Sequence, residues 1–239
     1  MTQTPVRRVS GRLTAMASAV SDRYPWLGPL IFVSSALYFF AQIAVAWVFR
    51  PSYNVIHNSI SDLGNSRCGP YGGTLVCSPR HVLMNVAFVF LGLVMVSGST
   101  LLYHEFSERR APERNAARVG FCCMAIGGVG TVLVGLFPEN TSHVLHITGA
   151  ALAIGVGNLG IFILGAVLSL PESMRRYMLV FSTVSATALL LFAFHKDFGV
   201  GAGTMERIAA YPETVWLISF GLYVWRFHPR DDPGHAAER

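Results

Sequence analysis

Side chains able to do acid–base or metal chemistry gather in three short polar segments of an otherwise apolar chain. The first segment, residues 51–65, mixes apolar residues with four candidates for chemistry: His57, Asn58, Ser61 and Asp62. A histidine and a serine four residues apart share one face of a short helix. A carboxylate beside them could act as a base or activate water. We therefore expect His57, Ser61 and Asp62 to be catalytic and Asn58 to bind substrate.

The same segment has a structural interpretation that the sequence leaves open. Its composition is too polar to span a membrane and too apolar for a freely solvated loop, which predicts an interfacial or re-entrant segment. Within it, Ser59 or Asp62 could cap a short turn that Gly64 ends, and this would account for Asp62 without catalysis.

The second segment joins two apolar stretches and contains a pair of histidines, His143 and His146, after Pro138. A spacing of three residues places both imidazoles near one helical face, which suits two ligands of one metal ion. With His195 as a third ligand, the pattern predicts a metal site, and zinc is the candidate cofactor. The alternative is two interfacial histidines that are hydrogen-bonded to carbonyls of the loop.

The third segment runs from His195 into the last apolar stretch and contains Glu206, Arg207, Tyr211 and Glu213. A carboxylate inside a membrane is costly and is a functional candidate by default. We expect Glu206 to be catalytic, and Arg207, Tyr211 and Glu213 to bind a lipid substrate through its phosphate and neighbouring groups. For Arg207 the favoured alternative is a structural ion pair with Glu206 or Glu213.

The composition indicates what kind of protein must position these groups. Of the 239 residues, 52% are hydrophobic and 13% are charged, whereas soluble domains carry about 25% charged residues. This excludes a soluble single-core enzyme, a disordered protein and a disulfide-dense miniprotein. The net charge is +5, but the arginines occupy short loops and form no basic stripe with interleaved aromatic residues. We therefore expect no nucleic-acid partner and expect membrane lipids as the surroundings.

Six apolar stretches are each long enough to cross a hydrocarbon core. They cover approximately 26–49, 81–103, 119–137, 143–170, 177–194 and 203–227. The predicted fold is an all-α integral membrane protein with a six-helix transmembrane domain over residues 26–227. An outside loop at 50–80 interrupts it, and polar tails occupy 1–25 and 228–239.

Lysine and arginine counts predict the orientation of this domain. With the N-terminus inside, 13 of the 18 basic residues lie in inside segments and 5 in outside segments. The positive-inside rule then places both termini in the cytoplasm of a multi-pass protein of the plasma (inner) membrane. Cys68 and Cys77 share the first outside loop, where an oxidising compartment lets a disulfide persist. We expect that bridge, the alternative being two unpaired thiols.

Glycines are concentrated in the third and fourth stretches. Such runs let helix backbones approach closely. We expect tight packing within the bundle; the alternative is a face on helices 3 and 4 for a membrane protein partner.

The polar segments together resemble a known family. The motif NSISDLG at 58–64, an asparagine in the second stretch, GLFP at 135–138 with two histidines after it, and GTMER at 203–207 carry the resemblance. The chain resembles, over about residues 26–227, the uncharacterised bacterial and archaeal six-span family catalogued as domain of unknown function 998. The SDLG region is also distantly similar to the Frag1/DRAM/Sfk1 family, which implies a link to lipid remodelling. The resemblance implies six spans and no settled activity.

Three functions are compatible with these patterns. The first is a metal-dependent, lipid-processing hydrolase at the outer leaflet, an idea supported by analogy to ceramidase-like hydrolases, which share these residue types at other spacings. The second is a non-catalytic lipid-binding, scaffold or accessory subunit. The third, a transporter lined by Glu213 and Asn158, is the weakest, since its polar residues cluster near one face.

Overall fold

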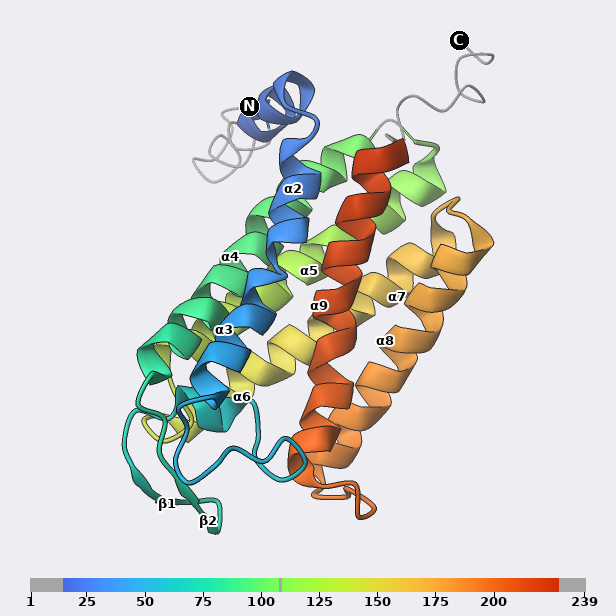
Figure 1. Ribbon diagram of the computed structural model, residues 1–239. Helices are drawn as coiled ribbons and strands as arrows, with labels where there is room; N and C mark the ends of the chain where they lie inside the picture. Colours follow the sequence, from blue (N-terminus) through green and yellow to red (C-terminus); the bar gives the residue numbers. More distant parts are fainter. Residues whose placement is uncertain (1–14, 108, 228–239) are drawn as a thin grey trace, which may run out of the picture.

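The computed structural model describes residues 15–107 and 109–227, and nearly all of their regular structure is helical. The long helices lie side by side along one common axis (Figure 1). In chain order they are α2 (Leu27–Ser34), α3 (Leu37–Ala46), α4 (His81–Glu105), α5 (Ala111–Leu136), α6 (His143–Ala150), the π-helix η2 (Ala151–Val156), α7 (Gly157–Val167), α8 (Glu172–Ala193) and α9 (Ala202–Phe227). The short elements are the 3-10 helix η1 (Ser61–Gly64) and the strands β1 (Gly69–Tyr71) and β2 (Thr74–Val76). The predicted tails at 1–14 and 228–239 lie outside the described residues.

Five helical stretches of the described chain are long and apolar enough to cross a membrane. They are α2–α3, α4, α5, α6–η2–α7 and α8. The fold is therefore that of a multi-pass membrane protein. The sixth predicted stretch forms α9, which packs against α2 and α8. α9 is 26 residues long, but it is not among the helices whose composition is apolar enough to cross a membrane.

The first predicted stretch is broken in its middle, between α2 and α3. There the hydroxyl groups of Ser34 and Ser35 donate hydrogen bonds, each of 2.6 Å, to the carbonyls of Ile31 and Phe32. Serine hydroxyls that bond back to the preceding turn bend helices. The break was not predicted, because Ser34 and Ser35 leave the stretch apolar enough overall to be treated as one span.

One end of the bundle carries the antiparallel hairpin of β1 and β2, and we call it the hairpin end (Figure 1). A disulfide joins Cys68 to Cys77 across the hairpin, which confirms that prediction. The start of α2 and the end of α9 lie together at the opposite end.

The glycine-rich helices pack against one another within the chain. A Cβ atom on Gly127 of α5 would lie 3.1 Å from the Cα of Gly157, and one on Gly130 would lie 2.5 Å from the carbonyl oxygen of Gly149. Only glycine allows backbones to approach this closely. These residues therefore serve contacts inside the bundle, and the alternative of a face for a membrane protein partner stays a prediction.

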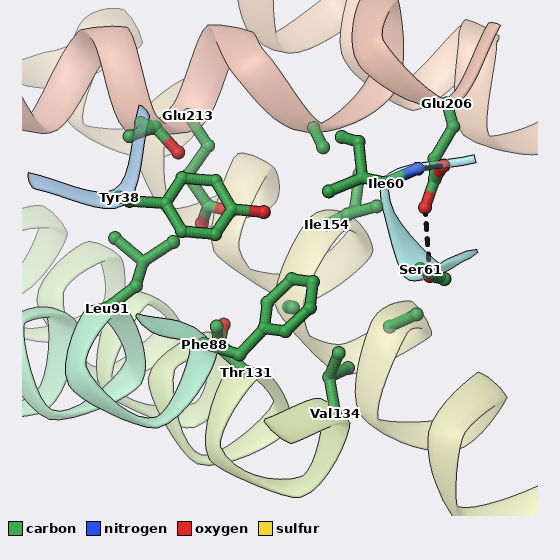
Figure 2. Close-up of a pocket in the computed structure, with 14 residues that line it drawn as sticks. Tyr38, Ile60, Ser61, Phe88, Leu91, Thr131, Val134, Ile154, Glu206 and Glu213 are labelled. Carbon is green, nitrogen blue, oxygen red and sulfur yellow. Dashed lines mark hydrogen bonds between the residues drawn. The ribbon is translucent and has the colours of Figure 1, made fainter. Parts of the chain in front are cut away.

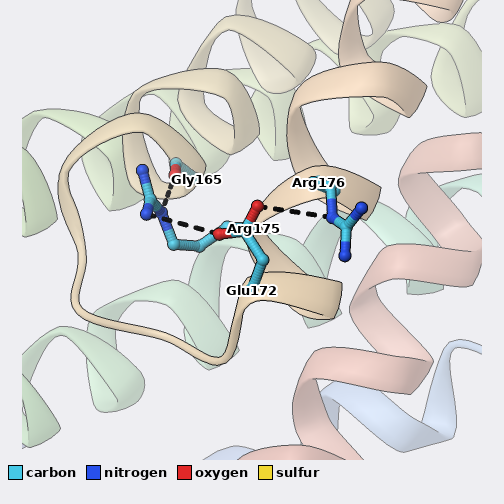
Figure 3. A network of polar contacts seen from close by, with 4 residues as sticks. All are labelled: Gly165, Glu172, Arg175 and Arg176. Carbon is cyan, nitrogen blue, oxygen red and sulfur yellow. Dashed lines mark hydrogen bonds and ion pairs between the residues drawn. The ribbon is translucent and has the colours of Figure 1, made fainter.

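The turn between α7 and α8, at the opposite end, is held by ordinary surface contacts (Figure 3). Glu172 pairs with Arg175 at 3.6 Å and with Arg176 at 3.3 Å, and the Nε of Arg175 donates to the carbonyl of Gly165. Exposed pairs of this kind contribute little stability, and no candidate residue lies among them.

Candidate functional site

Residues 50–66, which we call the cap segment, lie across the hairpin end of the bundle and are fastened there by Arg207 of α9. Its Nη1 donates to the carbonyls of Val55 and Asn58 at 3.0 Å each, and to Gly203 at 2.7 Å. Its Nη2 donates to the hydroxyl of Tyr53, and the guanidinium lies 5.4 Å from the centre of that ring. Arg207 therefore clamps backbone carbonyls. It makes no ion pair among the described residues, and both of its Nη atoms bind groups of the cap segment or α9.

The geometry of a helix cap accounts for Asp62. The Asp62 carboxylate accepts hydrogen bonds from the backbone N–H of Ser59 at 3.0 Å and from the side chain of Asn58 at 3.1 Å. In return, the N–H of Asp62 donates to the hydroxyl of Ser59 at 2.9 Å. This reciprocal pattern is a capping box. The capping alternative thus describes Asp62 in this structure, and Asn58 holds the same carboxylate.

A second carboxyl group, that of Glu139, lies against Asp62. It belongs to the loop between α5 and α6, and its Oε1 accepts a hydrogen bond of 3.0 Å from the side chain of Asn65. Burial raises the pKa of Glu139 to about 9, and the nearby carboxylates of Asp62 and Glu206 contribute to this rise, with Asp62 in hydrogen-bonding contact. Glu139 is therefore a neutral acid at pH 7 that can donate its proton to Asp62.

Ser61 occupies the centre of the site, between a histidine and a carboxyl group. Its Oγ lies 3.0 Å from Nε2 of His146 and 3.0 Å from Oε1 of Glu206. The other oxygen of Glu206 accepts a hydrogen bond from the backbone N–H of Ile60. His146 and Glu206 are 4% and 8% exposed, so both ionisable groups meet Ser61 out of bulk water.

A backbone carbonyl sets the state of the His146 ring. Nδ1 lies 3.0 Å from the carbonyl oxygen of Phe137, which only accepts hydrogen bonds, so Nδ1 carries a proton. In the neutral ring Nε2 then has a free lone pair, and it faces the Ser61 hydroxyl. This is the relation between a nucleophile and its general base, with a third group that orients the base.

A cavity of about 60 Å³ opens beside this cluster, inside the bundle (Figure 2). Ser61, Glu206, Glu213 and the hydroxyl residues Tyr38 and Thr131 contribute polar groups to its wall. Most of the remaining wall is apolar. The cavity lining comes from α3, α4, α5, α6, η2, α9 and the cap segment: Tyr38, Ile60, Ser61, Phe88, Leu91, Thr131, Val134, Ala150, Ala153, Ile154, Glu206, Ala210, Glu213 and Thr214.

Glu213 lines the cavity, and its carboxyl group packs directly against Gly157, which has no side chain. A Cβ atom on Gly157 would overlap Oε1 of Glu213, so any larger residue there would have to displace the carboxyl group. Glu213 is 6% exposed, and its Oε1 has no hydrogen-bond partner among the described residues.

Three predicted histidines lie apart from this cluster. His57, His143 and His195 are exposed, whereas His146 is buried. Two positions three residues apart on a helix differ by about 60° in direction, and here that difference turns His143 outward. Within residues 15–107 and 109–227, no three histidine, cysteine, aspartate or glutamate side chains form a group that could hold a metal ion. The residues predicted as zinc ligands, His143, His146 and His195, are thus not brought together.

Tyr211, which was predicted to contact substrate, lies between two helices. Its hydroxyl donates a hydrogen bond of 2.8 Å to Oε1 of Gln42 on α3, and its ring packs edge-on against Phe39. The tyrosine therefore joins two helices of the bundle.

Some members of the site were not predicted. Tyr53 contacts Arg207, and Glu139 contacts Asp62, although the partners are far apart in the sequence. Phe137 contacts His146 through its backbone carbonyl, which a side-chain pattern cannot indicate. Gly157 was noted only as part of a glycine run. The one signal in the sequence was Glu139 itself, an acid in the same loop as the histidines.

Comparison with known proteins gives one family. The family described as "Protein of unknown function (DUF998)" matches residues 32–223, which is most of the chain. Neither a curated protein nor a solved structure matches the sequence. The distant similarity to the Frag1 family receives no support from these comparisons.

Proposed function

The chain belongs to the DUF998 family, and from that premise and the geometry at Ser61 we propose that it is a membrane-embedded hydrolase that cleaves lipid esters. One observation carries the proposal: the 3.0 Å contact between Ser61 Oγ and Nε2 of a histidine whose other nitrogen is tied to a carbonyl. Ser–His pairs oriented in this way activate serine as a nucleophile. This replaces the expected metal mechanism with a serine mechanism.

The proposal includes the orientation of the chain. We infer that α9 is a sixth span, since it is 26 residues long and lies among the other helices. The excess of arginine in the segments at the opposite end then places that end in the cytoplasm. The hairpin end, with its disulfide, would face the outside of the plasma (inner) membrane, so that lipid reaches Ser61 from the outer leaflet.

The chemical steps follow from the hydrogen bonds. The Ser61 hydroxyl gives its proton to Nε2 of His146 as its oxygen attacks the ester carbonyl of the lipid. The protonated His146 then gives that proton to the departing alcohol, which leaves an acyl group on Ser61. Water attacks the acyl group, with His146 again as the base, and releases the fatty acid and the original serine.

Glu206 distinguishes this arrangement from the usual triad. In a Ser-His-Asp triad the carboxylate contacts the histidine; here a carbonyl does so, and Glu206 contacts the serine instead. Its bonds to Ile60 and Ser61 fix the position of the nucleophile against the cavity wall. Glu206 is thus a positioning residue that also competes for the serine proton.

The test is covalent labelling of the purified protein, in lipid nanodiscs, with a fluorophosphonate that reacts with activated serines. We expect stoichiometric labelling at Ser61 and its loss in Ser61→Ala and His146→Gln. Ser97→Ala is the matched control, because Ser97 lies exposed on α4 and bonds only to the carbonyl of Leu93. Absence of labelling in the folded wild-type protein would contradict the proposal, as would labelling that survives in Ser61→Ala.

A second candidate, a non-catalytic lipid-binding or scaffold subunit, is favoured by a different observation. Hydrogen bonds of Arg207, Asp62 and Asn58 hold the cap segment in place. Such hydrogen bonds are expected of a polar cluster whose role is to stabilise the fold. Unlabelled Ser61 together with one lipid species retained through purification, identified by mass spectrometry of the extract, would favour this candidate.

A further inference from the structure

The carboxyl group of Glu213 is the most unusual polar group in the described bundle. It is 6% exposed, and its Oε1 has no hydrogen-bond partner among residues 15–107 and 109–227. It pairs with no arginine or lysine within ion-pair distance in that part of the chain. An unpaired carboxylate in such a place is very costly, and a neutral acid is far less so.

The cavity beside Glu213 indicates which partner would satisfy its carboxyl group. A site of about 60 Å³ holds roughly four water molecules, if each needs about 10–15 Å³. Glu206 lines the same cavity, and Tyr38 and Thr131 add hydroxyl groups (Figure 2). A calcium or magnesium ion would take six or more oxygen ligands, whereas most of this wall is apolar. Water that bridges two carboxyl groups fits the lining better.

We propose that Glu213 is a proton-binding site, which exchanges its proton through cavity water with Glu206 and, by way of Ser61, with the hairpin end. The carboxyl proton of Glu213 passes to water, and water passes one to the carboxylate of Glu206. The Glu206 Oε1–H then donates to Ser61 Oγ as the Ser61 hydroxyl proton moves to Nε2 of His146. These steps conserve the proton, which ends on His146, and its release from His146 to solvent at the hairpin end completes the exchange. The proposal does not require Ser61 to attack a substrate.

Few ionisable groups face Glu213 from the surrounding elements. On α3 there is Tyr38, and on α9 there is Glu206, with Arg207 directed to the cap segment. The residues that α4, α5, α6 and η2 contribute to the cavity include no ionisable side chain, nor does Gly157 of α7, and α8 contributes no residue to its wall. Protonation of Glu213 therefore depends on Glu206 and the water between them.

The experiment is infrared difference spectroscopy of the full chain in nanodiscs while the pH is stepped. All samples carry Glu139→Gln, because the neutral acid at position 139 would add its own signal. We expect a protonated-carboxyl band that diminishes as the pH rises and that disappears on Glu213→Gln. Glu172→Gln, a change at an exposed acid of the opposite end, should leave the band intact. Ser61→Ala should keep the band but slow its response to a pH step.

Three outcomes would overturn the proposal. They are a band that persists in Glu213→Gln, a band of Glu213 that does not respond to pH, and a response whose rate is unchanged in Ser61→Ala. Fluorophosphonate labelling of the Glu139→Gln protein, in which Glu213 is intact, separates this result from the proposed hydrolase. Labelling without the band would support the nucleophile alone, and the band without labelling would support the proton site alone.

Discussion

Replacing Glu139 by glutamine should remove much of the pH dependence of the protein's stability. The pKa of this carboxyl group is raised from 4.5 to about 9, first by burial and then by Asp62. Between these two pH values the folded chain binds a proton that the unfolded chain has lost. The stabilisation is thus fully present below pH 4.5, and it is lost as the pH rises through 9.

The size of the effect follows from the shift. Each pH unit inside the window changes the free energy of unfolding by at most about 1.4 kcal/mol. Between pH 7 and pH 9 the wild-type protein should therefore lose at most about 3 kcal/mol, or about 6–12 °C in melting temperature for a chain of this length. The glutamine amide matches the neutral acid, since its N–H can donate to Asp62 and its oxygen can accept from Asn65. Glu139→Gln should therefore match wild type at low pH and exceed it at pH 9.

The assay is thermal unfolding in nanodiscs, followed by tryptophan fluorescence, at intervals from pH 5 to pH 9. Glu172→Gln serves as the control because Glu172 is an exposed acid in surface ion pairs. Asp62→Asn should bring the transition of Glu139 to lower pH by removing its charged neighbour. Equal pH slopes for wild type and Glu139→Gln would refute the assignment of a shared proton to the Asp62–Glu139 pair.

The other contacts give three further predictions. Arg207→Lys keeps the charge but cannot reach three carbonyls at once; it should cost about 1–3 kcal/mol and speed amide hydrogen exchange in the cap segment, and unchanged exchange would contradict the clamp. Gly157→Ala should destabilise the bundle by about 1–3 kcal/mol through overlap with Glu213, and Glu213→Ala in the same chain should recover part of that loss in a double-mutant cycle; strict additivity would argue against the contact. Cys68→Ser with Cys77→Ser should remove about 2–3 kcal/mol of local stability from the β1–β2 hairpin, seen as faster exchange there with the melting temperature of the helices little changed.

The helices were predictable because their cause is local. Apolar runs bounded by Pro51, Pro138 and Pro171 approximate the observed helices, since hydropathy and helix breakers act through the chain itself. Cys68 and Cys77 were predictable for a similar reason, as two cysteines in one short loop. The exact ends of the helices were less predictable. Helix α5 begins at Ala111, earlier than its apolar residues indicate, because its first turns are polar.

The site was predicted less well because its contacts are not local. For Asp62 the sequence offered both catalysis and capping and could not decide between them. For Arg207 it favoured an ion pair, whereas the guanidinium binds backbone carbonyls. His143 and His146 were treated as equivalent, although helix rotation exposes the first and buries the second. Ser61, Glu206 and His146 were all named as candidates, but the bonds between them, and the role of the Phe137 carbonyl, arise only in the folded chain.

The π-helix η2 lies between the part of the fourth helix that carries His146 and the part that carries Gly157. A π-helical turn accommodates an extra residue, which rotates the remainder of the helix by about 100° relative to an uninterrupted α-helix. This phase shift lets one helix direct His146 toward Ser61 and Gly157 toward Glu213. Deleting a single residue within 151–156 would restore regular α-helical phase, so this helix could no longer direct His146 to Ser61 and Gly157 to Glu213 at once.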